Sequence, residues 1–272
     1  MNDTKIEWAG ATWNPVTGCL HGCPYCYARR IAERFGGWTT SGTKTMEPYP
    51  GTELNRPLLV QRKNGKAINA PFPFGFKPTF HRYRLAEPKR KKQPRNIFVC
   101  SMADLFGAWV PDEWITAVFD ACREAPQHNY MFLTKNASRY GALAFQGLLP
   151  KESNFWYGVT AENHPKAANA FSHVPNGWDG YNLFLSAEPL QGEINILALD
   201  SWPRLVILGA ETGNRKGKKL PTRMEVEGTA NAAHIAGAAV FMKDSLIPVV
   251  GEEHMRRELP DGLREKQRGD GR

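Results

Sequence analysis

The chain has 272 residues, of which 42% are hydrophobic and 11% aromatic, a composition typical of folded globular proteins rather than disordered ones. No apolar run approaches the roughly 20 residues of a membrane-spanning helix, and the N-terminus lacks a secretory signal pattern. We therefore expect a cytoplasmic protein with no membrane partner, whose thiols stay reduced. The net charge of +8 favours a polyanionic partner, either nucleic acid or an acidic small molecule.

The first expected unit places three cysteines between a strand over residues 12–17 and a helix over residues 27–35. The connecting segment GCLHGCPYCYARR spaces Cys19, Cys23 and Cys26 as C-x3-C-x2-C. Three thiolates from one short loop suit three irons of a cubane cluster, and the fourth iron is left open to a chelating substrate. Gly18 and Gly22 permit the tight backbone that such a loop needs. The N-terminus of the helix would face the anionic cluster.

Zinc is the main alternative for this loop, but a zinc site normally uses four ligands, usually in two pairs. His21 lies between the first two cysteines, where the loop cannot easily turn it onto the same ion. Cys100 and Cys122 fall in apolar patterns typical of buried core cysteines, although a further role for Cys100 stays open. Ligand count therefore favours a cluster over zinc. A thiol-redox role is less favoured, because no simple C-x-x-C oxidoreductase context precedes the three cysteines.

Residues 36–96 interrupt the regular pattern and are rich in Gly, Pro, Lys and Arg. A connection this long is uncommon in a compact domain unless it serves as a lid or binding insertion. We expect it to follow the first βα unit and to pack over one mouth of the fold. Its aromatic side chains would either stack on bases, as in single-strand binders, or form a local core. They are Phe72, Phe74, Phe76, Phe80 and Tyr83.

Apolar runs and helical patterns then alternate along the chain, which predicts parallel strands joined by right-handed crossovers. Strands are expected over residues 97–101, 130–134, 155–160, 183–187, 205–210 and 238–243, and helices over 111–124, 136–148, 162–171 and 223–236. The fold class is therefore α/β, and the simplest architecture is a full or partial (β/α) TIM-like barrel. We expect one domain over residues 1–250, followed by a basic tail over 251–272.

Polar residues follow six of these apolar runs, where a (β/α) barrel carries its active site. Loop polarity would explain one such residue, but six in succession favour a functional ring. Trp8 and Trp13 beside the first strand are expected to be packing residues. The ring comprises Ser101, Asp104, Thr134, Lys135, Asn136, Thr160, Glu162, Asn163, Ser186, Glu188, Glu211, Thr212, Lys243 and Asp244.

The pattern C-x3-C-x-aromatic-C, with Tyr25 in the aromatic position, resembles the signature of the radical S-adenosylmethionine (SAM) superfamily. Its place after a first strand is also similar. The stretches TWNPVTGC, NIFVCSMADLFG, YMFLTKN, WYGVTAEN, LFLSAEPL, LVILGAETG and AAVFMKD resemble an uncharacterised family carried by phages and prophages. The context CPYCY resembles DNA photoproduct lyases of the same superfamily.

The resemblance implies a [4Fe–4S] cluster on Cys19, Cys23 and Cys26, with SAM as the second cofactor. A reductant such as flavodoxin or ferredoxin would supply the electron that cleaves SAM to a 5′-deoxyadenosyl radical. In the superfamily, residues after the second strand often receive the SAM amino group. Ser101 and Asp104 occupy that place here, although the usual Gly-Gly-Glu is absent.

Other cofactor contacts follow from chemistry and from the same resemblance. Glu162 or Glu188 would accept hydrogen bonds from the ribose hydroxyls, and Thr160 lies beside them in the ring. Lys135 would hold the SAM carboxylate or a substrate phosphate. The backbone at Tyr25 would support the adenine. Glu211 and Lys243 lie farther round the barrel and are the candidate catalytic residues on the substrate side.

The expected substrate is DNA, RNA or a nucleotide, because the charge is basic and the insertion combines aromatic with basic residues. Repair or modification of DNA bases is the favoured reaction class. Two alternatives stay open at this point. One is a non-catalytic nucleic-acid-binding protein with a structural metal site. The other is a radical SAM enzyme acting on a small molecule such as a nucleoside precursor.

Overall fold

The computed structural model describes residues 1–36, 52–61, 65–173 and 180–267. Parts of the expected insertion (37–51 and 62–64) and the last five residues of the expected tail lie outside the described residues. The described chain is mixed α/β and is built on one eight-stranded sheet. None of the helices described is long and apolar enough to cross a membrane.

The large sheet has the strand order β1-β2-β8-β9-β10-β11-β12-β13. Strand β1 pairs antiparallel with β2, and every other neighbouring pair is parallel. Parallel strands place all their carboxyl ends at one edge, which positions the candidate site. The strands are β1 Asn2–Asp3, β2 Ala11–Trp13, β8 Asn96–Val99, β9 Asn129–Thr134, β10 Phe155–Thr160, β11 Asn182–Ala187, β12 Leu205–Leu208 and β13 Ala239–Met242.

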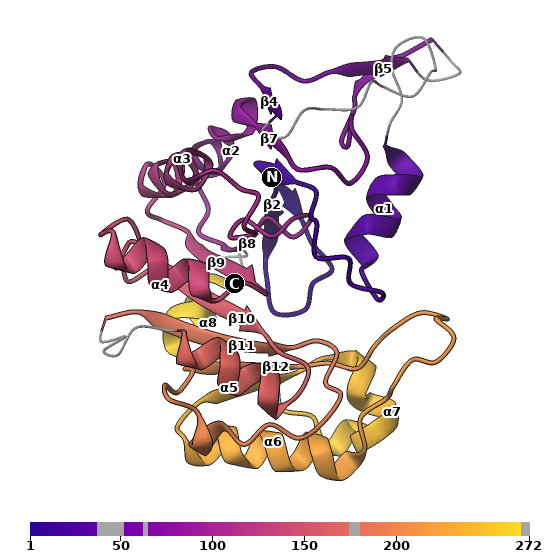
Figure 1. The fold of residues 1–272 in the computed structure, drawn as a ribbon, viewed down its shortest axis with the longest axis vertical. Coiled ribbons are helices and arrows are strands. Elements are labelled where there is room, and N and C mark those ends of the chain that lie inside the picture. The colour runs from indigo at the N-terminus through magenta and orange to yellow at the C-terminus, as the bar shows by residue number, and fades with distance from the viewer. Residues whose placement is uncertain (37–51, 62–64, 174–179, 268–272) are drawn as a thin grey trace.

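Figure 1 shows α3, α4, α5 and α6 around the outer side of this sheet, and the insertion strands near α1 at one end. Between β11 and β12 the described chain forms a short 3-10 turn, η2 Ile196–Ala198. The helices are α1 Tyr27–Phe35, α2 Glu87–Arg90, α3 Asp112–Arg123, α4 Ser138–Phe145, α5 His164–Ser172, α6 Arg223–Ile235, α7 Ile247–Val250 and α8 Asp261–Gln267. The remaining 3-10 turns are η1 Arg82–Arg84, η3 Asp244–Leu246 and η4 Glu252–His254.

The expected first strand over residues 12–17 is divided in two. Ala11–Trp13 pairs with β8 in the large sheet, whereas β3 Val16–Thr17 pairs with β7 Thr79–His81 of the insertion. The division falls at Asn14 and Pro15, and proline has no N–H to continue the ladder. Strand β4 Thr52–Leu54 also pairs with β7, and β5 Leu59–Gln61 pairs with β6 Ala67–Asn69.

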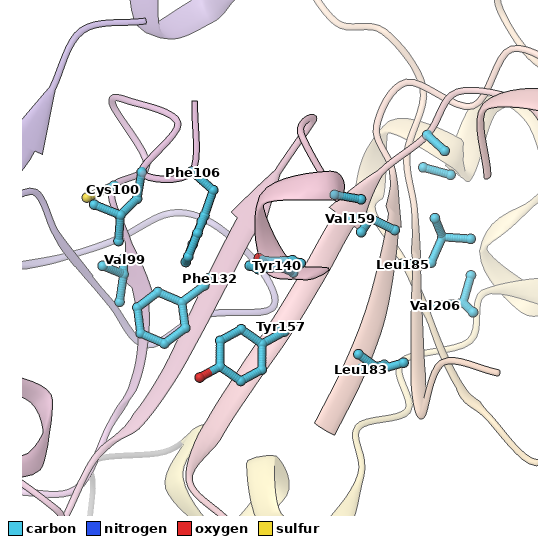
Figure 2. Close-up of a cluster of buried hydrophobic side chains, with 14 of the residues drawn as sticks. Val99, Cys100, Phe106, Phe132, Tyr140, Tyr157, Val159, Leu183, Leu185 and Val206 are labelled. Carbon is cyan, nitrogen blue, oxygen red and sulfur yellow. The ribbon is translucent and has the colours of Figure 1, made fainter. Parts of the chain in front are cut away.

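Successive strand residues alternate between the two faces of the sheet, and each face has its own buried cluster. Phe132, Tyr157 and Leu185 point toward the outer helices, and Figure 2 shows them in a row with Tyr140 of α4. Met131, Trp156 and Phe184 belong to the inner cluster. A Cβ at Gly158 would lie 2.2 Å from the Phe184 ring, so glycine is needed where this inner face is packed most tightly.

The N-terminal segment bridges the two edges of the sheet. Trp8 packs on Phe98 of β8, with ring centroids 4.8 Å apart, and on Phe184 of β11 at 6.2 Å. Glu7 accepts a hydrogen bond from the backbone N–H of Asp244, just after β13, at 2.8 Å. No ladder joins β13 to β1 or β2 among the described strands. These contacts favour the partial form of the expected barrel, which we retain as a proposal.

The described part of the C-terminal segment packs against the sheet. Leu259 and Leu263 are buried in the inner cluster. Asn96 and Asn129, at the starts of β8 and β9, donate side-chain hydrogen bonds to backbone carbonyls of α8 at 2.7 and 2.6 Å. Helix α8 therefore covers the inner face at the amino ends of the strands, whereas composition alone indicated a separate basic tail.

Candidate metal and cofactor site

The three cysteines lie on the loop that leads from β3 into α1, and all three thiols are free and partly buried. Gly18 has φ +90°, and a Cβ there would lie 2.2 Å from the carbonyl oxygen of Lys77. Cys26 caps α1, because its sulfur accepts a hydrogen bond from the Arg29 N–H at 3.3 Å. The loop is thus fixed at both ends, and the positive end of a helix dipole faces one sulfur.

The insertion forms the wall behind this loop. Phe76 and Met102 are buried with two alanines of α1, and Cys19, Cys26 and Phe72 pack against them. The Cys19 N–H also donates to the carbonyl of Phe76 at 3.2 Å. Phe72 and Phe76 therefore follow the second of the two expectations for the insertion, a local core, whereas Phe80 is buried in the outer core.

A pocket of about 230 Å³ opens between the cysteine loop and the carboxyl ends of the strands. It is much larger than the roughly 30 Å³ of one water molecule, so it suits a ligand of many atoms. All three cysteines and Tyr25 line it, together with eight of the fourteen expected ring residues: Ser101, Asp104, Thr134, Lys135, Thr160, Ser186, Glu188 and Lys243. Its apolar walls are formed by Ile6, Trp8, Phe76, Phe98 and Leu133.

One charged pair lies on the β11–β13 side of the pocket. The Lys243 ammonium donates to a Glu188 carboxylate oxygen at 2.7 Å, and Trp8 Nε1 and Ser186 Oγ donate to the other oxygen at 3.1 Å each. Although burial opposes the charge, the Glu188 carboxylate raises the pKa of Lys243. Gly209 leaves room for the pair, since a Cβ there would lie 3.2 Å from Lys243 Cδ.

A second charged group lies on the β9–β10 side. Lys135 Nζ is 3.0 Å from both the Tyr25 hydroxyl and a Glu162 oxygen, and the Tyr25 hydroxyl donates to that same oxygen. Lys166 Nζ is 2.8 Å from the other Glu162 oxygen. Burial opposes ionisation of Glu162, but hydrogen bonds from Lys166 and Tyr25 and the charge of Lys135 lower its pKa to about 2. Glu162 is therefore ionised at neutral pH.

Asp104 organises the loop after β8. Its carboxylate accepts hydrogen bonds from Phe106 N–H at 3.0 Å, Thr134 Oγ1 at 2.8 Å and Lys135 N–H at 2.9 Å. It also lies 2.7 Å from His21 Nε2. Because the chain's own groups already fill its acceptor positions, the structure assigns Asp104 to holding His21 and the strand ends in place.

Glu162 and Glu211 do not line the cysteine pocket. Glu162 faces the adjacent grooves, and Glu211 is held by Arg215, whose guanidinium donates to it at 2.6 and 2.8 Å. The hydrogen bonds from Arg215 lower the pKa of Glu211. Glu211 therefore stabilises the loop between β12 and α6 through its ion pair with Arg215. The sequence predicted a role only for the Tyr25 backbone. In the structure its side-chain hydroxyl also contacts Lys135 and Glu162.

Cys100 belongs to the outer core rather than to the pocket. It is buried, and Figure 2 shows it beside Val99 at one end of the row of core side chains. Burial raises the pKa of its thiol to about 12. Because Cys100 does not line the cysteine pocket, we assign it to core packing rather than to the metal site. Its backbone has φ +58°, and it turns the chain out of β8 toward Ser101.

Over residues 3–244 the chain matches the model of a family described as a protein of unknown function, DUF5131. The chain belongs to this family. No curated protein and no solved structure matches it.

The described part of this DUF5131 chain has no ready-made site for a single metal ion. No three His, Cys, Asp or Glu side chains in the described part of the chain converge on a point where they could hold one metal ion. His21, the nearest additional zinc ligand, is engaged by Asp104. In a cubane each thiolate binds a different iron, so the three sulfurs need not converge.

Burial disfavours the thiolate form of two cysteines in this loop. Burial raises the pKa of Cys19 to about 12, and it also raises the pKa of Cys23. Thiol–disulfide catalysts lower the pKa of the attacking cysteine instead. A bound metal centre would supply the positive charge that these thiols need in order to ionise, because metal ligation releases thiol protons.

Sequence reasoning missed two contributors to the site. Trp8 was expected to be packing alone, yet its indole lines the pocket and donates to Glu188. Asn14 holds the turn after β8, since its side-chain oxygen accepts from Ser101 Oγ at 3.2 Å and from Met102 N–H at 2.9 Å. The signal in the sequence was Asn14, a polar residue directly before Pro15, where the first expected strand is interrupted.

Proposed function

We propose that this protein is a radical SAM enzyme, with Cys19, Cys23 and Cys26 holding a [4Fe–4S] cluster. The observation that carries the proposal is the position of these three free cysteines. They line one pocket with the Lys243–Glu188 pair and with Lys135, at the carboxyl ends of parallel strands. When bound and reduced, such a cluster would supply the one electron needed for reductive cleavage of SAM, which would make hydrogen-atom abstraction from a substrate possible.

The residues of the pocket have distinct tasks in this proposal. Glu188, the one of the two expected ribose acceptors that lines the cysteine pocket, would accept hydrogen bonds from SAM hydroxyls. Lys243 and Lys135 are compact cations suited to a carboxylate or phosphate. Ser101 and Thr160 add hydroxyl groups, and the aromatic walls exclude water from the reacting atoms.

We further propose a nucleic-acid or nucleotide substrate, with repair or modification of a base as the reaction class. The net charge of +8 supports a polyanionic substrate. We give Glu211 no role at the reacting atoms, because it does not line the cysteine pocket and is paired with Arg215. We still assign Lys243, which lines the pocket, to the substrate side. The protein would draw its electron from a reductant such as flavodoxin or ferredoxin.

The test is SAM cleavage by the anaerobically reconstituted protein with dithionite as the electron source. The wild type and Cys122→Ala are expected to form 5′-deoxyadenosine, because Cys122 is buried in the outer core. Cys23→Ala is expected to form none while remaining folded. A cluster-loaded wild type that forms no 5′-deoxyadenosine contradicts the proposal. Loss of folding in Cys23→Ala with no SAM cleavage by the wild type supports a structural metal site instead.

A further inference from the structure

A polar groove of about 460 Å³ lies beside the cysteine pocket and shares Cys23, Tyr25 and Lys135 with it. Its other side is formed by Lys166 of α5 and by Arg215 and Lys219 of the loop between β12 and α6. Four cationic side chains thus line a hollow that contains one carboxylate, Glu162. The groove is therefore chemically unlike the apolar pocket next to it.

The groove keeps an excess of positive charge after its internal pairs are counted. Glu162 is shared by Lys135 and Lys166, and Arg215 is paired with Glu211. Lys219 donates to the Gln191 carbonyl and lies 3.8 Å from Glu225. Arg30 and Lys218 add charge nearby, since both lower the pKa of Glu211. These six cations outnumber the three carboxylates, which favours an anionic ligand.

A second polar hollow, of about 490 Å³, continues from the groove between α4 and α5. The two hollows share Lys135, Glu162 and Lys166, and the second adds Ser138, Asn169 and His173. The Lys166 side chain is 58% exposed, as is that of Lys219, so both ammonium groups are accessible to a ligand from solvent. The arrangement suits an elongated ligand with more than one negative group.

We propose that this groove binds the phosphate groups of a nucleotide or of a nucleic-acid strand, next to the pocket that receives the reacting part. Lysine and arginine side chains bind phosphate groups without requiring a strict geometry. This binding does not depend on the base sequence of the nucleic acid. Cys23, Tyr25 and Lys135 are common to groove and pocket, so a phosphate bound in the groove would lie beside the cysteine pocket. The assignment of the reacting part rests on the proposed function, whereas the phosphate site does not.

The test is fluorescence anisotropy with labelled single-stranded DNA and RNA, and with a mononucleotide as competitor, at two salt concentrations. The double variant Lys166→Gln/Lys219→Gln is expected to weaken binding by roughly tenfold and to lower the salt slope by about one to two. The matched control Arg123→Gln/Lys151→Gln removes the same charge from exposed side chains that line neither hollow, and it is expected to bind like the wild type. Affinity that rises with length identifies a strand, and equal competition by the mononucleotide identifies a free nucleotide.

Equal weakening by the two double variants would overturn the proposal, because it would reflect net charge rather than a groove. Unchanged binding by the groove variant, or no binding by the wild type at low salt, would also overturn it. Formation of 5′-deoxyadenosine by the wild type without oligonucleotide reports the radical chemistry separately. If that product forms while the groove variant binds normally, the phosphate site fails and the proposed function stands.

Discussion

The Lys243 ammonium lies 2.7 Å from a Glu188 carboxylate oxygen and links the ends of β13 and β11 inside the cysteine pocket. Both side chains are about three-quarters buried, with exposures of 25% and 22%. A charge left without its partner at this depth keeps part of its desolvation cost, so the pair is expected to matter for both stability and ligand binding.

We expect Lys243→Met to lower the free energy of unfolding by about 2 kcal/mol, because Glu188 would keep its charge without a cation. The double variant Lys243→Met/Glu188→Gln should lose less than the sum of the two single effects, by about 1 kcal/mol. Lys89→Met is the control, since Lys89 and Glu124 are both 63% exposed and their pair is worth little. Urea denaturation measures all four changes. Additive effects at Lys243 and Glu188 would contradict the coupling.

The cysteine loop is expected to tolerate a side chain at Gly22 but not at Gly18. Both have positive φ, yet a Cβ at Gly22 meets open space and one at Gly18 would collide with the Lys77 backbone. Gly22→Ala should therefore cost about 1 kcal/mol of backbone strain and still bind iron. Gly18→Ala should lose most of its reconstituted iron. Iron content and thermal unfolding measure the difference, and equal behaviour of the two variants would refute the packing argument.

Acid is expected to weaken the wall behind the cysteine loop through His81. Burial and the nearby charge of Arg84 lower the pKa of His81 from 6.5 to about 3, and its ring lies 2.9 Å from Thr17 Oγ1. The unfolded chain thus binds a proton that the folded chain does not, so this contribution is present above pH 6.5 and is lost as pH falls toward 3.

The free energy of unfolding should therefore fall by up to about 1.4 kcal/mol per pH unit between roughly pH 6 and 4 because of His81. His81→Gln should reduce that slope by the same amount. Denaturant titrations at several pH values measure it. A slope that is the same in wild type and variant would show that His81 does not carry the effect.

Much of the fold could be predicted from the sequence, because buried parallel strands appear there as short apolar runs. Phe155–Thr160 agrees with the expected bounds, and Tyr27–Phe35 follows the cysteine loop as expected. Lys135, Glu188 and Lys243 were predicted as site residues from the ends of these strands, and all three line one pocket. Such residues converge whenever strands run parallel, so their meeting needs no knowledge of individual contacts.

Other parts depend on contacts that no local pattern encodes. Glu211 follows a strand, as Glu188 does. Its carboxylate, however, is bound by Arg215, four residues later in the chain, and is not part of the cysteine pocket. Trp8 looks like any packing tryptophan until the chain brings Glu188, 180 residues away, to its indole N–H. On composition, the aromatics of the insertion suited base stacking and a local core equally well. Only the structure shows that Phe72 and Phe76 pack with the alanines of α1.

The identity of the metal centre after anaerobic reconstitution with iron and sulfide tests the central claim most directly. We expect about four irons and four sulfides per chain in the wild type and in Cys122→Ala, with a brown chromophore and a reduced-cluster electron paramagnetic resonance signal. Cys19→Ala, Cys23→Ala and Cys26→Ala should each lose that signal. One zinc per chain with no chromophore, or a cluster retained in all three cysteine variants, would contradict the account.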